Sequence, residues 1–256
     1  MKVAAYQVPL LQVGSMEAID LIREHVAWCE AEGVEILCCP EAVLGGLADY
    51  ATSPEDFALD MESGQFAEVL ASLASDTVTT IVGFTEVSGE GAIYNSAAVF
   101  HQGAVAGVYR KRHPAINRSV YQAGDESPVF TIGGLTFGIL ICNDSNFPEL
   151  AESMAAQGAA ALFIPTNNGL PPEKADVVAQ ARNVDVALAT ANRVWVIRAD
   201  VAGRDGGRVS YGSSGIIDPE GRILSTARRL AEDLLVADID IAPVHRPCPP
   251  NVGRHA

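Results

Sequence analysis

Aromatic and basic residues are scarce in this chain of 256 residues. Phe, Trp and Tyr make up 6% of the sequence, and 17 Lys and Arg stand against 32 Asp and Glu, which leaves a net charge of −15. A surface of that sign repels phosphate backbones and anionic lipids, so we expect no nucleic-acid partner and no membrane partner. Long apolar runs are also missing. The stretch from Val129 to Cys142 comes nearest to the about 20 residues of a membrane helix, and Gly133-Gly134 interrupts it.

Cysteine is also scarce, and its spacing argues against two common uses. The five cysteines are Cys29, Cys38, Cys39, Cys142 and Cys248. An odd count with one adjacent pair and no CxxC spacing supports neither a disulfide framework nor a zinc site, and the histidines show no metal-ligand spacing. We therefore expect no bound metal and a reduced, cytoplasmic protein. The beginning of the chain is a poor secretory signal, because Gln7 and Pro9 interrupt its apolar region.

The sequence does contain enough apolar material for a folded core, since apolar residues make up 48% of it. Apolar residues recur at helical spacing after Ser15, which predicts a helix that stops at Gly33. Further helices are expected over Phe66 to Leu73, Pro148 to Gln157 and Glu173 to about Ala189. Strands are expected over Lys2 to Val8, Val34 to Cys39, Thr77 to Phe84, Tyr94 to Phe100, Ala104 to Arg110, Val129 to Ile132, Leu135 to Ile141, Ala160 to Ile164, Trp195 to Ala199, Ser214 to Ile217, Arg222 to Leu224 and Leu234 to Ile239.

These strands alternate with helices in some places and form hairpins in others. That mixture predicts mixed sheets covered by helices, an α/β layered sandwich rather than a parallel barrel. No low-complexity linker divides the chain, so we expect a single domain over residues 1–256. Its last part, residues 244–256, is rich in proline and is expected to be an extended arm that could serve assembly.

Three of the expected strands end in residues that suggest chemistry. Glu41 directly follows a buried run, Lys111 closes a hairpin strand, and Cys142 lies where an apolar run meets polar residues. In α/β sheets, binding and catalytic groups gather beyond the carboxyl ends of strands. Strand alternation places Lys111 on the face of Tyr109 and Val105. If the strands are neighbours, the carboxylate, the ammonium group and the thiol converge in one pocket.

This trio is suited to acyl transfer. Cys142 would attack a carbonyl or nitrile carbon, and a thiol with an ordinary pKa of about 8.5 needs a base or a cation nearby to react at neutral pH. Glu41 would take the thiol proton, pass it to the leaving amine and later activate water to hydrolyse the thioester. Lys111 would stabilise the thiolate and the oxyanion, together with the backbone N–H of Asn143.

Taken singly, each of the three residues also has a structural explanation. Free cysteine is among the most buried residue types, so Cys142 could be part of the core. Glu41 could cap the turn that follows Pro40, and Lys111 could be a solvated charge at a sheet edge. The residue types alone leave both explanations open.

The surroundings of these residues resemble the nitrilase superfamily of carbon–nitrogen hydrolases, and the resemblance runs nearly end to end. The segments that carry it are Val3 to Gln7, Cys39 to Glu41 with Gly45, Asn95 to Ala97, Gly107 to His113, Ile141 to Glu149, Gly212 to Ser214 and Asp218 to Gly221. They are similar, in order, to the family's opening strand, its glutamate, lysine and cysteine motifs and its late hairpin.

The resemblance implies a four-layer αββα sandwich with two mixed sheets and a Glu41–Lys111–Cys142 catalytic triad. It also implies no cofactor, a small-molecule amide as substrate, and a homodimer or a higher homo-oligomer. The amidase-like branch of the family is expected, in which a small amide is hydrolysed through a cysteine thioester and ammonia or an amine is released. Two alternatives remain: a catalytically silent or specialised paralogue that binds a ligand or partner, and an acyltransferase that uses the same cysteine.

The chain departs from the family pattern at two positions. Asn117 stands where many members carry a second glutamate, a substitution that could impair or redirect activity, and Asp125 or Glu126 could supply the missing carboxylate. The family's Arg-Ala-x-Glu-Asn stretch is matched to residues 188–192, Leu-Ala-Thr-Ala-Asn, which predicts that both charges of a buried ion pair are lost.

Further candidates surround the triad. We expect Asn143, Tyr50, Phe147, Asn117 and Asn167 to form the oxyanion and substrate pocket. A substrate carboxylate could be bound by one of three arginines, Arg110, Arg112 or Arg118. His113 could act as a general base, although a histidine beside an edge strand is more often structural. The glycine-rich segment 203–207 is expected to be a polar loop rather than a phosphate-binding loop, because it lacks the Gly-Lys-Ser/Thr ending.

Overall fold

The computed structural model describes residues 1–116, 118–174 and 177–240. Its strands are Lys2–Pro9 (β1), Ile36–Cys38 (β2), Leu59–Asp60 (β3), Thr79–Val87 (β4), Ile93–His101 (β5), Ala104–Arg110 (β6), Val129–Ile132 (β7), Leu135–Ile139 (β8), Ala161–Pro165 (β9), Trp195–Ala199 (β10), Val201–Asp205 (β11), Arg208–Ser210 (β12), Gly215–Ile217 (β13), Ile223–Thr226 (β14) and Asp233–Asp238 (β15). Its α-helices are Ala18–Glu32 (α1), Gln65–Leu70 (α2), Pro148–Ala156 (α3) and Val178–Asn192 (α4).

The strands form two mixed sheets. The first sheet follows the order β12-β11-β1-β2-β4-β5-β6, with β15 also paired to β1 and β3 to β4. The second follows the order β14-β13-β10-β9-β8-β7. Parallel pairs, such as β1 with β2 and β8 with β9, arise where a helix connects the strands, and antiparallel pairs, such as β5 with β6, arise from hairpins.

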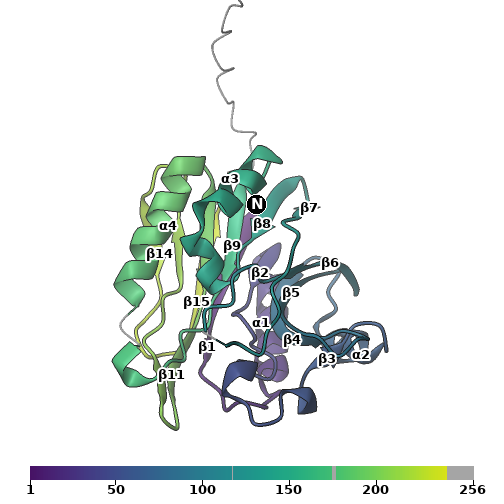
Figure 1. Cartoon of the computed structure of the whole chain (residues 1–256). Helices are drawn as coiled ribbons and strands as arrows, with labels where there is room; N and C mark the ends of the chain where they lie inside the picture. Colours follow the sequence, from purple (N-terminus) through teal and green to yellow (C-terminus); the bar gives the residue numbers. More distant parts are fainter. Residues whose placement is uncertain (117, 175–176, 241–256) are drawn as a thin grey trace, which may run out of the picture.

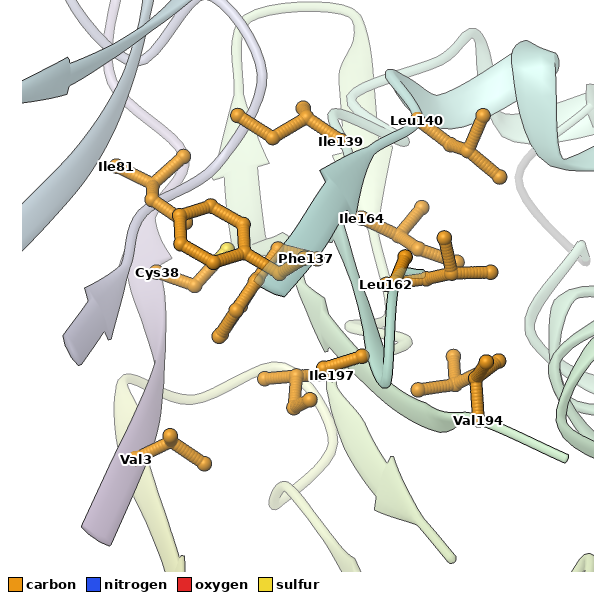
Figure 2. Close-up of a cluster of buried hydrophobic side chains, with 14 of the residues drawn as sticks. Val3, Cys38, Ile81, Phe137, Ile139, Leu140, Leu162, Ile164, Val194 and Ile197 are labelled. Atoms are coloured by element: carbon orange, nitrogen blue, oxygen red, sulfur yellow. The ribbon is translucent and has the colours of Figure 1, made fainter. Parts of the chain in front are cut away.

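The sheets are packed face to face and covered by helices on their outer sides (Figure 1). The inner core joins residues of both sheets, with Val3, Cys38 and Ile81 from the first and Phe137 and Ile197 from the second (Figure 2). Helices α1 and α2 cover the outer face of the first sheet, and α3 and α4 cover that of the second. The expected four-layer αββα sandwich is therefore confirmed.

Strand alternation divides β1 between the two cores. Val3 and Ala5 belong to the inner core, whereas Ala4 and Tyr6 belong to the outer cluster under α1. Helix α1 contributes Ile22 to the same outer cluster, and it ends where Gly33 adopts a left-handed conformation with φ of 69°. The helical periodicity and the stop that the sequence predicts are thus both present.

Most expected elements are found within a few residues of their predicted bounds, and three differ. Residues 203–205 are not a polar loop but part of β11, which forms a hairpin with β12 around Gly206 and Gly207. Helix α4 begins at Val178 rather than at Glu173, which instead lies in a short 3-10 turn. The short strand β3 was not expected from the sequence.

The C-terminal arm expected over residues 244–256 lies outside the described residues. Within the described ranges, no helix combines the length and the apolar character needed to cross a bilayer.

Candidate active site

Glu41 is positioned by a tight turn after β2. Ala42, the next residue, has a positive φ of 45°, and the turn lies directly against Gly83 of β4. A Cβ atom on Gly83 would lie 2.3 Å from the carbonyl oxygen of Pro40 and 2.6 Å from the nitrogen of Ala42. Only glycine therefore lets the turn approach this closely. The result is a carboxylate that is 1% exposed at the carboxyl end of a central strand.

Three donors converge on the Glu41 carboxylate. Its Oε1 atom accepts hydrogen bonds from Lys111 Nζ and, across 2.8 Å, from Asn95 Nδ2. Its Oε2 atom accepts the backbone N–H of Asn167 across 2.9 Å. Lys111 is 4% exposed and follows β6, and its backbone N–H donates to the Asn95 carbonyl on the neighbouring strand β5. The carboxylate is thus fixed from the first sheet and from the end of β9 in the second.

Cys142 begins a 3-10 turn, Cys142–Asn146, at the end of the β8 segment, and has a positive φ of 47°. This conformation is uncommon for residues other than glycine and needs support from its surroundings. Buried Asp144 supplies it, because its carboxylate accepts the Tyr109 hydroxyl across 2.8 Å and the backbone N–H groups of His113 and Ile141 across 2.8 and 3.2 Å. Tyr109 lies two residues before Lys111, so β6 supports both parts of the site.

A buried guanidinium lies behind this turn. Arg198 of β10 donates to both oxygens of Asp185 from Nε, across 3.0 and 2.9 Å, and to Thr166 Oγ1 from Nη1, across 2.7 Å. Its Nη2 donates to Ser145 Oγ across 3.1 Å, and Ser145 Oγ donates to the Cys142 carbonyl across 2.7 Å. The chain of hydrogen bonds connects β10 to the turn that carries the thiol.

The expectation that α4 has lost its buried ion pair is wrong. The charges lie earlier in the helix than the matched stretch, at Arg182 and Asp185. Asp185 is completely buried and pairs with Arg198, while Arg182 approaches it across 3.7 Å and donates to the carbonyls of Ser213 and Ser214. The two residues are three positions apart and therefore share one face of the helix.

Glu41, Lys111 and Cys142 line one cavity of about 210 Å³. Its other lining residues are Leu47, Asp49, Asn95, Pro114, Ala115, Ile116, Tyr121, Asn143, Ser145, Asn146, Asn167, Asn168, Leu170, Val177, Gln180, Ala181 and Arg198. The sequence-based prediction that carboxylate, ammonium and thiol converge is therefore met by the geometry of the described residues.

Burial and the neighbouring charges shift the pKa values of Cys142 and Lys111. Burial and the negative charge of Glu41 raise the pKa of the Cys142 thiol to about 12, against the lowering effect of Lys111 and Arg198. Burial by itself would lower the pKa of Lys111, but the negative charges around it, above all Glu41, raise it above the ordinary value. At neutral pH the resting site therefore holds an ammonium group and a protonated thiol.

The other predicted pocket residues divide into two groups. Asn143 and Asn167 line the cavity. Phe147 instead stacks on the His113 ring, with 3.5 Å between ring centroids, which gives His113 a structural environment. Tyr50 lines a different surface hollow, and Arg208 lies over its ring. Asn117 lies outside the described residues.

None of the three arginines expected to bind a substrate carboxylate lines the cavity in the described part of the chain. Arg110 pairs with Glu86 in another hollow, and Arg112 donates to Ser127 Oγ. Arg118 is exposed. Asp125 and Glu126, expected as replacements for the second glutamate, lie in the hollow of Arg110 and not in the cavity.

Several residues that contribute to the site were not predicted from the sequence. Arg198 carried a usable signal, since it is a charged residue inside a short apolar strand, where only a paired charge is tolerated. Asp144 also lies in a buried position directly after an apolar run. Asn95 belongs to one of the motif segments, but nothing in the sequence marked it as a partner of Glu41. The cavity residue Asp49 carried no signal beyond its polar character.

Comparison with known proteins assigns the family. The family model described as carbon–nitrogen hydrolase matches residues 2–246. The chain therefore belongs to the carbon–nitrogen hydrolases of the nitrilase superfamily, which confirms the resemblance of its motifs, and it is a hydrolase of the nitrilase or amidase type.

Curated relatives cover most of the chain. It is 32% identical over 246 residues to the "hydrolase in pqqF 5′ region" of Pseudomonas protegens, and this match covers 94% of this chain and 83% of the relative. It is 30% identical to a nitrilase of Pyrococcus abyssi, over 88% of this chain and 82% of the relative. It is also 30% identical to an (R)-stereoselective amidase of a Pseudomonas species, over 80% of this chain and 72% of the relative.

Solved structures share the fold at lower sequence identity. Saccharomyces cerevisiae Nit3 superposes with a TM-score of 0.81 at 22% identity, over 93% of this chain and 89% of Nit3. An amidase from Nesterenkonia sp. AN1 superposes with a TM-score of 0.79 at 23% identity, over 94% of this chain and 93% of the amidase. The chain therefore has the same overall fold as these two structures.

Proposed function

We propose that this carbon–nitrogen hydrolase cleaves a small amide through a thioester on Cys142 and releases ammonia or an amine. The observation that carries the proposal is the arrangement of Glu41, Lys111 and Cys142 around one small cavity, with the first two in direct contact. The curated relatives include a nitrilase and an (R)-stereoselective amidase, which supports a nitrile or carbonyl carbon as the electrophile.

The protonation state of the thiol defines the role of Glu41. Because the pKa of Cys142 is raised to about 12, the thiol is protonated at neutral pH and cannot wait as a thiolate. A base must accept its proton as sulfur attacks the substrate. Glu41 lines the same cavity, and its carboxylate is oriented by Asn95, Lys111 and Asn167. We assign it as that base.

The reaction balances with this single proton carrier. The Cys142 sulfur forms a bond to the acyl carbon while Glu41 takes the thiol proton, and the tetrahedral intermediate collapses as Glu41 delivers that proton to the departing nitrogen. Water then enters, gives a proton to Glu41 and attacks the thioester carbon. The thiolate leaves and recovers the proton, which releases the carboxylic acid and restores the resting enzyme.

Lys111 and Asn143 are assigned to the negative charge that develops on the acyl oxygen. The Lys111 ammonium group is buried and stays protonated, since the surrounding carboxylates raise its pKa. The backbone N–H of Asn143 belongs to the 3-10 turn that begins at the nucleophile. A fixed positive group and a backbone donor, already oriented in a cavity, stabilise an oxyanion more than water would.

Intact-protein mass spectrometry with a panel of small amides tests the proposal. A mass gain on Cys142 that decays in water supports the hydrolase. A gain that decays only when an amine or alcohol acceptor is added indicates an acyltransferase, and no gain with any amide indicates a silent, ligand-binding paralogue. The Cys142→Ala variant, which removes the proposed nucleophile, serves as the control for the site of modification.

Two substitutions separate the roles of the acid–base group and the nucleophile. Cys142→Ala is expected to abolish turnover while the fold remains intact, as checked by ammonia release and circular dichroism. Glu41→Gln keeps the shape of the side chain but removes the base, so thioester formation and breakdown are expected to stop. Normal turnover in either variant rules out the role assigned to that residue.

Assembly, location and the effect of Asn117 stay predictions. Mass photometry of the full chain tests the expected homodimer or higher homo-oligomer, and fractionation tests the expected cytoplasmic location. Asn117→Glu restores the second glutamate of the family pattern. An increase in kcat for small amides would indicate that asparagine at this position impairs turnover.

A further inference from the structure

The charged residues that line the catalytic cavity differ in whether they form ion pairs. Among its described lining residues, the charged ones are Glu41, Asp49, Lys111 and Arg198. Lys111 is paired with Glu41, and Arg198 is paired with Asp185 on α4. Asp49 makes no ion pair with a lysine or arginine in the part of the chain that the structure describes. It is therefore the cavity charge that a ligand could neutralise.

The Asp49 carboxylate is held in place by neutral donors. Oδ2 accepts the Ser119 hydroxyl across 3.0 Å, and Oδ1 accepts the backbone N–H of Val120 across 2.9 Å. Two ionised carboxylate oxygens offer about four acceptor positions in total, so both retain acceptor capacity after these bonds form. The half-buried side chain is thus oriented before any ligand arrives, which reduces the entropy lost on binding.

Apolar side chains line part of the same cavity as Asp49. Leu47 precedes Asp49 by two residues in the chain, and Pro114 and Ile116 belong to the segment whose continuation, Ser119 and Val120, holds the Asp49 carboxylate. Such a wall packs against methylene groups and offers no charged donor. A chain of methylenes that ends in a cation matches both parts of this surface.

We propose that Asp49 is a cation-binding subsite of the catalytic cavity, and that the substrate is a small amide whose acyl chain ends in an ammonium or guanidinium group. The proposal rests on the proposed amidase function, because it takes the acyl carbon to lie at Cys142. It names a specificity residue, Asp49, that acts by contact with the part of the substrate remote from the scissile bond.

The charged residues that line the cavity also disfavour anionic substrates. Both cations that line the described cavity already have carboxylate partners, so neither is an unpaired counter-ion for a substrate carboxylate. The negative charge of Asp49 would also repel such a carboxylate. The net charge of −15 acts in the same direction over longer distances, because it attracts cations to the protein and repels anions.

Three amides of matched length test the proposal. 4-Aminobutanamide carries the ammonium group, and pentanamide replaces it by a methyl group. Succinamate carries a carboxylate in place of the terminal aminomethyl group. We expect kcat/KM, measured by ammonia release at low ionic strength, to be on the order of tenfold higher for the ammonium amide than for pentanamide, and lowest for succinamate. 3-Aminopropanamide and 5-aminopentanamide then report which chain length fits.

The decisive comparison uses Asp49→Asn with Asp56→Asn as its control. Asp56 is an exposed aspartate on the neighbouring loop that lines a different hollow, so its substitution changes the net charge of the protein equally. In Asp49→Asn the preference for 4-aminobutanamide over pentanamide is expected to vanish, mainly through KM. In Asp56→Asn the preference is expected to persist. Added salt should reduce the preference in the wild type, since it screens a partly exposed charge pair.

The outcomes separate this proposal from the proposed function. Hydrolysis of all three amides at equal kcat/KM, or a loss in Asp49→Asn that is the same for all three, overturns the subsite and leaves the amidase in place. If no amide is hydrolysed, calorimetric binding to the Cys142→Ala variant still decides. Binding of 4-aminobutanamide that exceeds that of pentanamide and is lost in Cys142→Ala/Asp49→Asn supports the subsite, and equal or absent binding overturns it.

Discussion

Arg198 donates a hydrogen bond to Ser145 Oγ across 3.1 Å, and Ser145 Oγ in turn donates one to the carbonyl oxygen of Cys142 across 2.7 Å. Nη1 of the same guanidinium donates to Thr166 Oγ1, and the next residue, Asn167, donates its backbone N–H to Glu41. One buried cation is thus connected to the turn of the proposed nucleophile and to the segment that orients the proposed base.

This relationship predicts that Arg198 positions the catalytic groups without contacting the bond that breaks. Arg198→Met leaves buried Asp185 without its main partner, and the loss of one member of a buried ion pair costs about 3–5 kcal/mol. We expect a lower free energy of unfolding, measured in urea, and a kcat reduced by on the order of tenfold or more. Arg198→Lys keeps the charge but loses the fork of donors, so it is expected to recover stability more than kcat.

A merely structural role for Arg198 gives a different result. The double variant Arg198→Met/Asp185→Leu removes both charges and is expected to be more stable than Arg198→Met alone. Its kcat should nevertheless stay low, because the contact with Ser145 is still missing. Recovery of kcat in parallel with stability would argue against a positioning role.

The protonated state of Cys142 predicts how its alkylation depends on pH. Since the pKa of the thiol is raised to about 12, the thiolate fraction should increase about tenfold for each pH unit between pH 7 and 10. The rate of carbamidomethylation by iodoacetamide, followed by mass spectrometry, is expected to rise over this range without a plateau. A plateau near pH 8 to 9 would indicate an ordinary thiol.

Lys111 is expected to increase the reactivity of the Cys142 thiol. Its ammonium group lowers the pKa of Cys142, so its removal should raise this pKa further and slow alkylation at every pH below it. Lys111→Met, whose side chain has similar length, is the variant of choice, and Lys174→Met on an exposed turn is the matched control. Equal alkylation rates in wild type and Lys111→Met would show that the two groups are not coupled.

Gly83→Ala should disrupt the turn that carries Glu41. The new Cβ would lie 2.3 Å from the Pro40 carbonyl oxygen and 2.6 Å from the Ala42 nitrogen, and these are backbone atoms that cannot rotate away. We expect a loss of about 1–3 kcal/mol in the free energy of unfolding and a lower kcat, because Glu41 moves with the turn. Gly89→Ala has room for its Cβ and serves as the control. An unchanged thermal midpoint would contradict this account of the turn.

Tyr109→Phe tests the support of the Cys142 turn. The substitution removes one of the donors to buried Asp144 without changing the aromatic ring. Hydrogen bonds to charged groups contribute about 1.5–3 kcal/mol, so we expect a stability loss of that order in urea unfolding. The remaining donors, the backbone N–H groups of Arg112, His113 and Ile141, keep the turn formed, and some activity is expected to remain.

The main elements of the fold could be predicted from the sequence because they depend on local patterns. Alternation in Lys2–Pro9 and helical spacing up to Gly33 are properties of neighbouring residues. Alternation failed where a local irregularity intervened. The register of β5 with β6 shifts at Val99 and Phe100, so Val105 packs with the outer cluster while Tyr109 packs in the inner core. The prediction that both share the face of Lys111 is therefore wrong for Val105.

The candidate site was predictable only where its residues follow strand ends. Glu41, Lys111 and Cys142 are marked by that position, and so is Asn167 after β9. Tyr50 and Phe147 are close in sequence to site residues, yet the first lines a different hollow and the second stacks on His113, because the direction of a loop side chain depends on tertiary packing.

The sequence by itself determined which residues could be an acid, an ammonium group and a nucleophile, and which strands and helices carry them, because strand ends and hydrophobic periodicity are local. Only the tertiary structure decided which charges meet. Asp185 and Arg198 are paired across 13 positions, Glu41 and Lys111 across 70, and Asp49 is left without a cation among the described residues. Such pairings depend on which strands become neighbours in the two sheets, and that order is set by packing of the whole core.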